Sequence, residues 1–232
     1  MGHNRDFRRV KTMMRFAIFS DLHDNRRGME AVVQHALIQG AERLICLGDV
    51  GHERTLYEEL RARRIACTYG NWEVSGLQRL PRDLAAWVGN WPALLHVGAA
   101  VCCHATPDMP PAAATTHQAV RWMATGQKWS ALFPRLHLDQ EAVWQAFAWM
   151  EAAGVSLAFH GHTHVQMVWQ WQPGSAGSSR LRPITGVDVI PVMEGARYLV
   201  GVGSAGQPQD GPSPRYAIYD ERMQRVHLVE AR

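Results

Sequence analysis

Short apolar runs alternate with helical repeats over the first half of this chain, and this order constrains the fold more than any other feature. Strands are predicted at residues 14–20, 43–47 and 65–69, with helices between them at 26–39 and 53–64. In the first helix Met29, Val32 and Ala36 recur at helical spacing, and Gly40 marks its end. This order is typical of a parallel sheet covered by helices, which binds ligands at the carboxyl ends of its strands.

Each of these ends is followed by residue types that bind metals. The residues concerned are Asp21, His23, Asp49, Asn71, His104 after a further apolar run at 99–103, His162 and His164. His162 and His164 lie two apart, so both side chains can reach one small volume. Each residue alone can serve as a cap or a turn residue, and a zinc-type ion needs three or more protein ligands. Turn chemistry would favour Ser, Pro and Gly just as often, so the recurrence predicts one shared site.

The motifs Asp-x-His, Gly-Asp, Gly-Asn, His and Gly-His-x-His together resemble the pattern of the calcineurin-like metallophosphoesterase superfamily. The resemblance runs from residue 14 nearly to the end of the chain. The segment Val-Gly-Ser-Ala-Gly-Gln-Pro at 202–208 is similar to the compact bacterial and archaeal branch, whose members are described as phosphodiesterases or as diadenosine tetraphosphatase-like proteins. The resemblance implies an α/β fold, a four-layer α-β-β-α sandwich of two packed mixed β-sheets flanked by helices.

The resemblance also implies a site for two metal ions. It sorts the seven residues into three sets, with Asp21, His23 and His164 on the first ion, Asn71, His104 and His162 on the second, and Asp49 bridging both. An anionic bridge reduces the repulsion between two divalent ions, which lie about 3.5–4 Å apart in such sites. A mixed imidazole and oxygen shell suits two divalent transition-metal ions, namely manganese, iron, zinc, cobalt or nickel, with manganese as the first choice.

With two such ions bound, a water shared between them would lose a proton near neutral pH and attack the phosphorus in line. The catalytic residues would be Asp49, Asn71 and His104, acting with this metal-bridging hydroxide. The positive charge left on the site favours an anionic substrate. The resemblance therefore predicts a hydrolase, a two-metal phosphoesterase acting on a small phosphodiester, a nucleotide or a phosphoanhydride.

Residue 72 departs from the family pattern. Many members have Gly-Asn-His followed by an acidic residue, and that histidine is assigned to the transition state or to the leaving group. Here the run is Gly70-Asn71-Trp72-Glu73, and an indole cannot transfer a proton. General acid help is typically worth about a hundred- to ten-thousandfold, so we expect faster hydrolysis of esters with good leaving groups than of alkyl monoesters. Glu73 is interpreted as a supporting or capping residue.

A proline-rich segment at 105–139 interrupts the strand pattern directly after His104. We predict a lid insertion here, because an insertion that leaves from a metal ligand is well placed to cover the site. A short helix at 115–125 would place His117 and Arg121 four apart on one face, which makes them the lid candidates. A solvated connector with a small tryptophan core explains the same segment equally well.

The second half of the chain has the pattern of one helix and several strands. A helix is predicted at 138–154, and strands are predicted at 165–172, 181–191, 198–203, 216–219 and 226–229. Gly, Pro and Ser turns separate these strands. We expect them to form the second sheet, packed on the first.

Composition bounds the class of protein. The 232 residues are 47% hydrophobic with a net charge of +3, which fits a single domain over 14–232 and does not favour a nucleic-acid partner. No apolar run approaches the roughly 20 residues of a membrane-spanning helix, and the start lacks the apolar core of a secretory signal. We therefore expect a cytoplasmic protein with no membrane partner. Residues 1–13 are predicted to be a mobile N-terminal extension, and the oligomeric state stays open.

Three classes of function are compatible with these motifs. The first is the two-metal phosphoesterase acting on a small phosphorylated substrate. The second is a serine/threonine phosphoprotein phosphatase of the same chemistry, which a closed lid would disfavour. The third is a non-catalytic binding scaffold, as in the retromer subunit that resembles this family. The complete set of seven ligands argues against a scaffold, because a cluster of buried charge and imidazole is costly to keep.

Overall fold

The computed structural model describes residues 13–174 and 179–232. Apart from Met13, the predicted N-terminal extension lies outside the described residues, so its mobility stays a prediction. Within the described ranges, no helix has the length and apolar character needed to cross a membrane.

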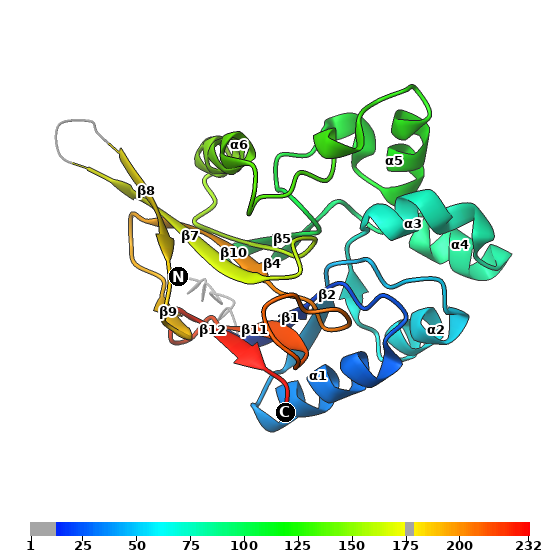
Figure 1. The fold of residues 1–232 in the computed structure, drawn as a ribbon, viewed down its shortest axis with the longest axis horizontal. Coiled ribbons are helices and arrows are strands. Elements are labelled where there is room, and N and C mark those ends of the chain that lie inside the picture. The colour runs from blue at the N-terminus through cyan, green and yellow to red at the C-terminus, as the bar shows by residue number, and fades with distance from the viewer. Residues whose placement is uncertain (1–12, 175–178) are drawn as a thin grey trace, which may run out of the picture.

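The first half of the chain has the predicted alternation of strands and helices (Figure 1). Its elements are β1 (Arg15–Phe19), α1 (Arg26–Ile38), β2 (Arg43–Cys46), α2 (Arg54–Ala62), β3 (Ala66–Cys67), α3 (Asn71–Gly76), a 3-10 turn (Leu77–Arg79), α4 (Arg82–Val88), β4 (Leu94–Val97) and β5 (Ala100–Cys103). The helix α1 begins where the side chain of Asn25 accepts a 2.8 Å hydrogen bond from the amide of Gly28. The helix α3 and the strand β4 were not predicted.

The second half contains one long helix and seven strands among the described residues. Its elements are two 3-10 turns (Pro111–Ala113 and Trp129–Ala131), α5 (Thr116–Met123), α6 (Gln140–Ala152), β6 (Leu157–His160), β7 (Gln166–Pro173), β8 (Ser179–Ile184), β9 (Val189–Pro191), β10 (Arg197–Val202), β11 (Arg215–Asp220) and β12 (Arg225–Glu230). The prediction of a single strand at 181–191 is wrong. The structure has two strands in this region, because Gly186, with a φ of 73°, turns the chain between β8 and β9.

The strands form two mixed six-stranded sheets. The first has the order β3-β2-β1-β11-β12-β9 and the second the order β4-β5-β6-β10-β7-β8. The expectation that the late strands make the second sheet by themselves is wrong, because β11 pairs antiparallel with β1 and β10 pairs parallel with β6. Each sheet therefore combines strands from both halves of the chain.

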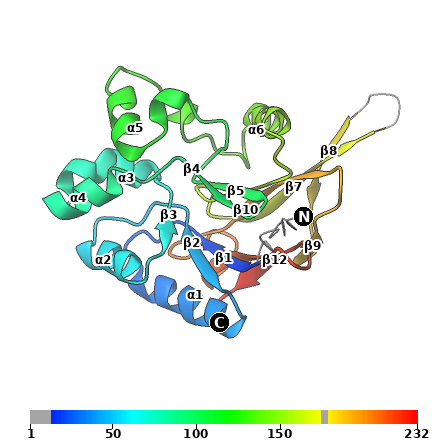
Figure 2. The same cartoon turned by 180° about the vertical axis from the view of Figure 1, so that it is seen from behind.

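Three apolar cores separate four layers. Figures 1 and 2 show α1 and α2 on the outer face of the first sheet and α6 on the outer face of the second. Representative core residues are Phe19 and Val32 under α1, Ile18 and Phe159 between the sheets, and Phe147 and Leu199 under α6. The predicted four-layer α-β-β-α sandwich is confirmed.

The segment 105–139 is a packed part of the domain. Its helix α5 lies beside α3, and Ala119, Leu132 and Phe133 belong to the same core as α1 and α2. At the start of α5, the side chain of Thr115 accepts a hydrogen bond from the amide of Gln118. That the segment acts as a lid stays a prediction.

Candidate metal centre

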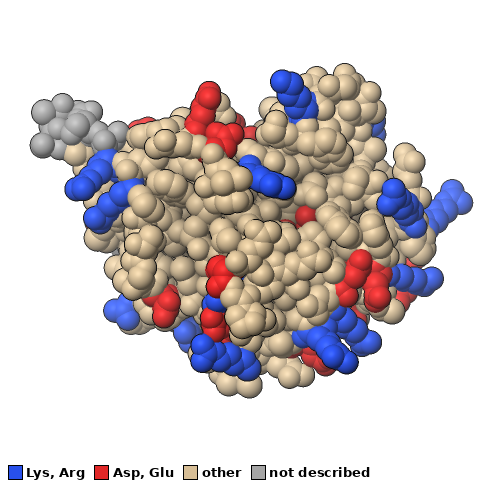
Figure 3. Space-filling view, in the orientation of Figure 1, with Lys and Arg blue, Asp and Glu red and all other residues tan. Residues whose placement is uncertain are grey.

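The seven predicted ligands meet where strands of both sheets end. In the first sheet β2 is parallel to β1 and β3, and in the second sheet β5 is parallel to β6. Both groups of candidate ligands combine residues that follow strands of the two sheets, so these carboxyl ends meet on one side of the sandwich. Figure 3 shows a hollow near the middle of this side, with an acidic side chain at its floor and a basic side chain at its rim.

Asp21, His23 and His164 form the first group of candidate ligands. Nε2 of His23 lies 3.0 Å from Nε2 of His164. Oδ1 of Asp21 lies 3.8 Å from the first of these nitrogens and 3.4 Å from the second. Donor atoms that bind one ion at about 2.0–2.2 Å lie roughly 3–3.5 Å from each other, so these side chains are close to the spacing of ligands on a shared ion.

Asp49, His104 and His162 form the second group, with Asn71 beside it. Nε2 of His104 lies 3.2 Å from Oδ1 of Asn71 and 3.5 Å from Oδ2 of Asp49. The same Oδ2 lies 3.9 Å from Nε2 of His23 in the first group. Asp49 therefore stands between the two groups, where a bridging ligand would be.

Backbone carbonyls orient three of the four imidazoles. Nδ1 of His104 is 2.9 Å from the carbonyl of Leu47, and Nδ1 of His164 is 2.9 Å from the carbonyl of Gln207. Nε2 of His162 is 3.1 Å from the carbonyl of Phe133. A carbonyl only accepts, so each of these nitrogens donates, and in the neutral imidazole the other ring nitrogen keeps a free lone pair. Metal-binding histidines are commonly held in this way.

Burial and charge set the protonation of these groups. Burial alone would raise the pKa of Asp21, but the imidazoles of His164 and His23 hold that pKa well below its usual value. Burial alone would lower the pKa of His104, but the carboxylate of Asp49 outweighs it and the pKa is raised to about 10. Burial and the neighbouring His104 lower the pKa of His162 to about 4. The protein thus gathers carboxylate charge in a place where a cation would balance it.

The donor set fits divalent transition-metal ions. Among the described residues, Oδ1 of Asp21 is buried and receives no hydrogen bond, although buried polar atoms are rarely left without a partner. This oxygen faces the imidazoles of His23 and His164. Imidazoles with carboxylate and amide oxygens are a ligand set for manganese, iron, zinc, cobalt or nickel.

Five of the seven candidate ligands have a left-handed backbone. Their φ angles are 57° at Asp21, 44° at His23, 52° at Asp49, 63° at His162 and 59° at His164. Such a conformation costs about 1–2 kcal/mol per residue, and it clusters at functional sites. At Asp21, His23 and Asp49 this conformation is held by hydrogen bonds between the loops after β1 and β2, from the amide of Asp21 to the carbonyl of Gly48 and from the amide of His23 to the carbonyl of Asp49.

Glu73 supports the loops after β2 and β3 from inside the protein. Its buried carboxylate accepts hydrogen bonds from the amides of Asp49, Val50 and Gly70, at 2.9, 2.9 and 2.7 Å. It also accepts one from the hydroxyl of Tyr57, at 3.1 Å. These contacts agree with the interpretation of Glu73 as a supporting residue.

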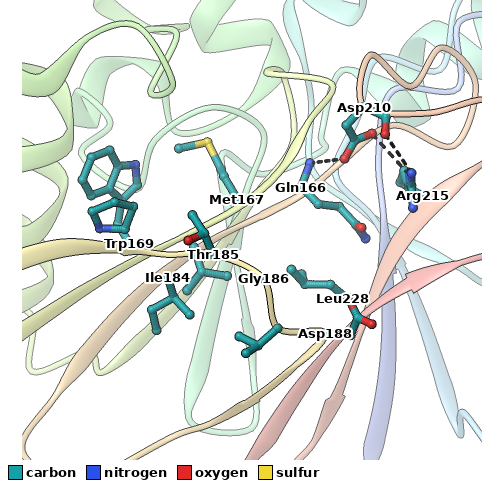
Figure 4. Close-up of a pocket in the computed structure, with 13 residues that line it drawn as sticks. Gln166, Met167, Trp169, Ile184, Thr185, Gly186, Asp188, Asp210, Arg215 and Leu228 are labelled. Atoms are coloured by element: carbon teal, nitrogen blue, oxygen red, sulfur yellow. Dashed lines mark hydrogen bonds and ion pairs between the residues drawn. The ribbon is translucent and has the colours of Figure 1, made fainter.

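An ion pair between Asp210 and Arg215 supports the loop that carries His164 (Figure 4). The carboxylate of Asp210 accepts a 2.9 Å hydrogen bond from the amide of Gln166 and pairs with Arg215 at 3.3 Å. The neighbouring amide of Gln209 donates to the carbonyl of His164. Gln166, Asp210 and Arg215 line a cavity of about 350 Å³ beside β7 and β8, and none of the seven predicted ligands lines it. These residues position His164 from outside the site.

Trp72 lies at the position where the family pattern has a histidine. The centre of its ring is 4.8 Å from that of His23 and 4.5 Å from that of His52. Its backbone amide donates a 2.9 Å hydrogen bond to Oδ1 of Asp49. The side chain therefore forms an aromatic wall beside the ligands, and it offers no group that can protonate a leaving oxygen.

The polar residues at the rim of the site differ from the predicted lid residues. Arg135 and His137 line a cavity of about 230 Å³ together with five of the seven candidate ligands, and neither was among the predicted lid residues. His117 lies instead against Gly89, and Arg121 is exposed on α5. The structure brings neither of these two into the ligand-lined cavity. The sequence signal of Arg135 and His137 was their place in the insertion that follows His104.

Comparison with known proteins gives the family and the fold. Residues 14–224 match the model of the calcineurin-like phosphoesterase superfamily domain. An uncharacterised protein of Methanocaldococcus jannaschii is 22% identical over 95% of this chain and 87% of its own length. The crystal structure of a metallophosphoesterase from Sphaerobacter thermophilus has a TM-score of 0.68 at 24% identity, covering 94% of this chain and 90% of that one. A Thermus thermophilus protein of solved structure has a TM-score of 0.51 at 10% identity, covering 95% of this chain and all of that one.

Proposed function

Because the chain belongs to the calcineurin-like phosphoesterase superfamily, we propose that it hydrolyses a small phosphodiester, a nucleotide or a phosphoanhydride with two divalent metal ions, manganese being the first choice. The superfamily membership supports a hydrolase of phosphate esters. The two-ion site, the manganese and the substrate class are our proposal.

One observation carries the proposal of two ions. Oδ2 of Asp49 lies within 4 Å of an imidazole nitrogen in each group, at 3.9 Å from His23 and 3.5 Å from His104. A single carboxylate placed between two sets of ligands is what two nearby divalent ions need, because it reduces their mutual repulsion. A site for one ion would need only one of the two groups.

The chain's own residues divide the remaining work. When bound, divalent ions would lower the pKa of a water molecule and neutralise charge on phosphoryl oxygens. Asn71 and His104 would hold the ion on one side of the reacting phosphate, with the imidazole of His104 fixed by the carbonyl of Leu47. Arg135 lines the same cavity, and its guanidinium can pair with a phosphate oxygen.

The size of the ligand-lined cavity supports a small substrate. Its volume is about 230 Å³, below the roughly 300–1,000 Å³ of sites that enclose a drug-sized ligand. A phosphoryl group with its immediate substituents fits such a space.

A hydrolysis panel with metal-loaded protein tests the proposal. The substrates are a bis-aryl phosphate, an aryl phosphate, a dinucleoside polyphosphate and a phosphopeptide, each with and without added manganese. We expect manganese-dependent hydrolysis of the diester or the polyphosphate in preference to the phosphopeptide. Turnover of the phosphopeptide alone would support the phosphoprotein phosphatase instead. Absence of hydrolysis together with absence of bound metal would support the scaffold.

A further inference from the structure

A second cavity opens beside the candidate metal centre, and we call it the side pocket. Its volume is about 370 Å³, and it is lined by Asn71, Ser75, Trp129, Phe133, Arg135 and His162. Asn71, Arg135 and His162 also line the ligand cavity. A molecule that reaches the ligands with one end can therefore occupy the side pocket with the other.

An exposed indole forms part of the side pocket. The side chain of Trp129 is 45% exposed, and its ring stacks on that of Phe133, with centroids 5.7 Å apart and planes at 27°. Phe133 is buried and its ring lies 6.0 Å from that of His162. The indole is therefore backed by a fixed ring and joined to a candidate ligand by one further aromatic contact. A backed and solvent-accessible aromatic face is suited to stacking a planar ring.

A cation lies at the junction of the two cavities. Arg135 is exposed, and no ion pair joins it to a carboxylate in the part of the chain that the structure describes. An arginine without a partner at the rim of a phosphate-cleaving site can bind a phosphate by two parallel hydrogen bonds. The charge and the aromatic ring thus lie in the same pocket, as a nucleotide would require.

We propose that the side pocket binds the base of a nucleotide or nucleotide-like substrate, with the base stacked on Trp129 and its phosphate paired with Arg135. The proposal rests on the proposed function, because it adds a substrate class to the same site. Stacking accepts any base, since every base has a π-face. The pocket therefore selects for nucleotides over phosphates without a ring, and it does not select one base.

Another tryptophan provides a matched control. Trp144 on α6 is 43% exposed, close to the exposure of Trp129, and it lines neither cavity. Exposure alone therefore does not distinguish the two indoles. Their positions relative to the ligands do.

Equilibrium binding to the manganese-loaded protein tests the proposal. The two probes are adenosine 5′-monophosphate and ribose 5-phosphate, which carry the same phosphate and differ in the base. Both are alkyl monoesters, so slow turnover is expected during a calorimetric titration. Base stacking is worth about 5- to 150-fold in affinity. We expect adenosine 5′-monophosphate to bind more tightly than ribose 5-phosphate by a factor in this range, and Trp129→Ala to remove most of that difference.

Two further variants separate stacking from general damage. Trp129→Phe keeps an aromatic face and should retain most of the preference for the base, while Trp144→Ala should leave the affinities for both probes unchanged. Equal binding of the two probes by the unaltered protein would overturn the proposal. So would an equal loss of both affinities in Trp129→Ala. The protein could show a base preference that depends on Trp129 and yet hydrolyse none of the substrates. That result would overturn the proposed function but support the binding of a base in the side pocket.

Discussion

The buried carboxylate of Glu73 accepts a 2.9 Å hydrogen bond from the backbone amide of Asp49, 24 residues earlier in the chain. The same carboxylate accepts from the amide of Gly70, next to Asn71. One side chain therefore fixes the loop of the bridging candidate and the loop of the amide candidate relative to each other. The position of Asp49 between the two ligand groups depends on this contact.

Glu73→Gln should destabilise the protein strongly. Its amide nitrogen cannot accept from backbone amides, so at least one buried N–H loses its partner, at a cost on the order of 3 kcal/mol. We expect a fall of that size in the free energy of unfolding, measured by urea denaturation, together with weaker metal binding. Tyr57→Phe removes a hydroxyl that Glu73 shares with the carbonyl of Gly51 and leaves the amides paired, so it should cost about 1 kcal/mol. Equal losses in the two variants would contradict this role of Glu73.

His164→Ala and His162→Ala should each release one metal ion. The two residues lie in different ligand groups, so each variant leaves the other group complete. We expect the manganese content, measured by elemental analysis after desalting, to fall from two ions per chain to about one in either variant. His137→Ala, at the rim of the same cavity, should keep both ions. Loss of both ions, or of neither, in the single variants would mean that the ligands are sorted wrongly.

The absence of an acid at position 72 should appear in the leaving-group dependence of the rate. We expect kcat/KM to fall steeply from aryl to alkyl phosphodiesters, because the leaving oxygen departs without a proton. Trp72→His should raise the rate on the alkyl ester by about a hundredfold or more and change the rate on the aryl ester little. Trp72→Phe, which keeps the aromatic wall, should preserve the steep dependence. Comparable rates across the series in the unaltered protein would contradict this account.

Gly161→Ala should disrupt the site through a steric clash. A Cβ at this position would overlap the side chains of Ser20 and Asp21, so the loop that carries His162 would have to move. We expect a loss of metal binding and a lower melting temperature. Gly154→Ala provides the control, because φ is 67° there and no atom lies within 4 Å of the added Cβ. Its cost should be limited to the backbone strain, about 1–2 kcal/mol, with metal binding kept.

The sequence predicted the parts of the fold that depend on local pattern. Helices α1 and α2 and the strands β1, β2, β3 and β5 occur close to their expected positions, because periodicity and caps are local properties. It did not predict that β11 would join β1. Antiparallel and parallel partners have the same strand pattern, so the choice of sheet depends on tertiary contacts that a single sequence does not show.

The residues of the candidate site were likewise predictable only in part. The candidate ligands were predictable because their types recur at strand ends, and the structure brings Asp21 and His164 together although 143 positions separate their numbers in the sequence. Arg135 and Trp129 were not selected, because only the packing of the segment 105–139 places them beside His162. Arg121, on the same segment, had an equally good local pattern and lies on the exposed side of α5.

The most direct test of the two-ion proposal is phosphodiesterase activity measured against manganese content during titration of the metal-free protein, for the unaltered chain and for Asp49→Asn. We expect no activity below one ion per chain and a rise as the second ion binds. We expect Asp49→Asn not to hold both ions and not to reach that rate. Full activity at one ion per chain, or undiminished activity in Asp49→Asn, would contradict the two-ion proposal.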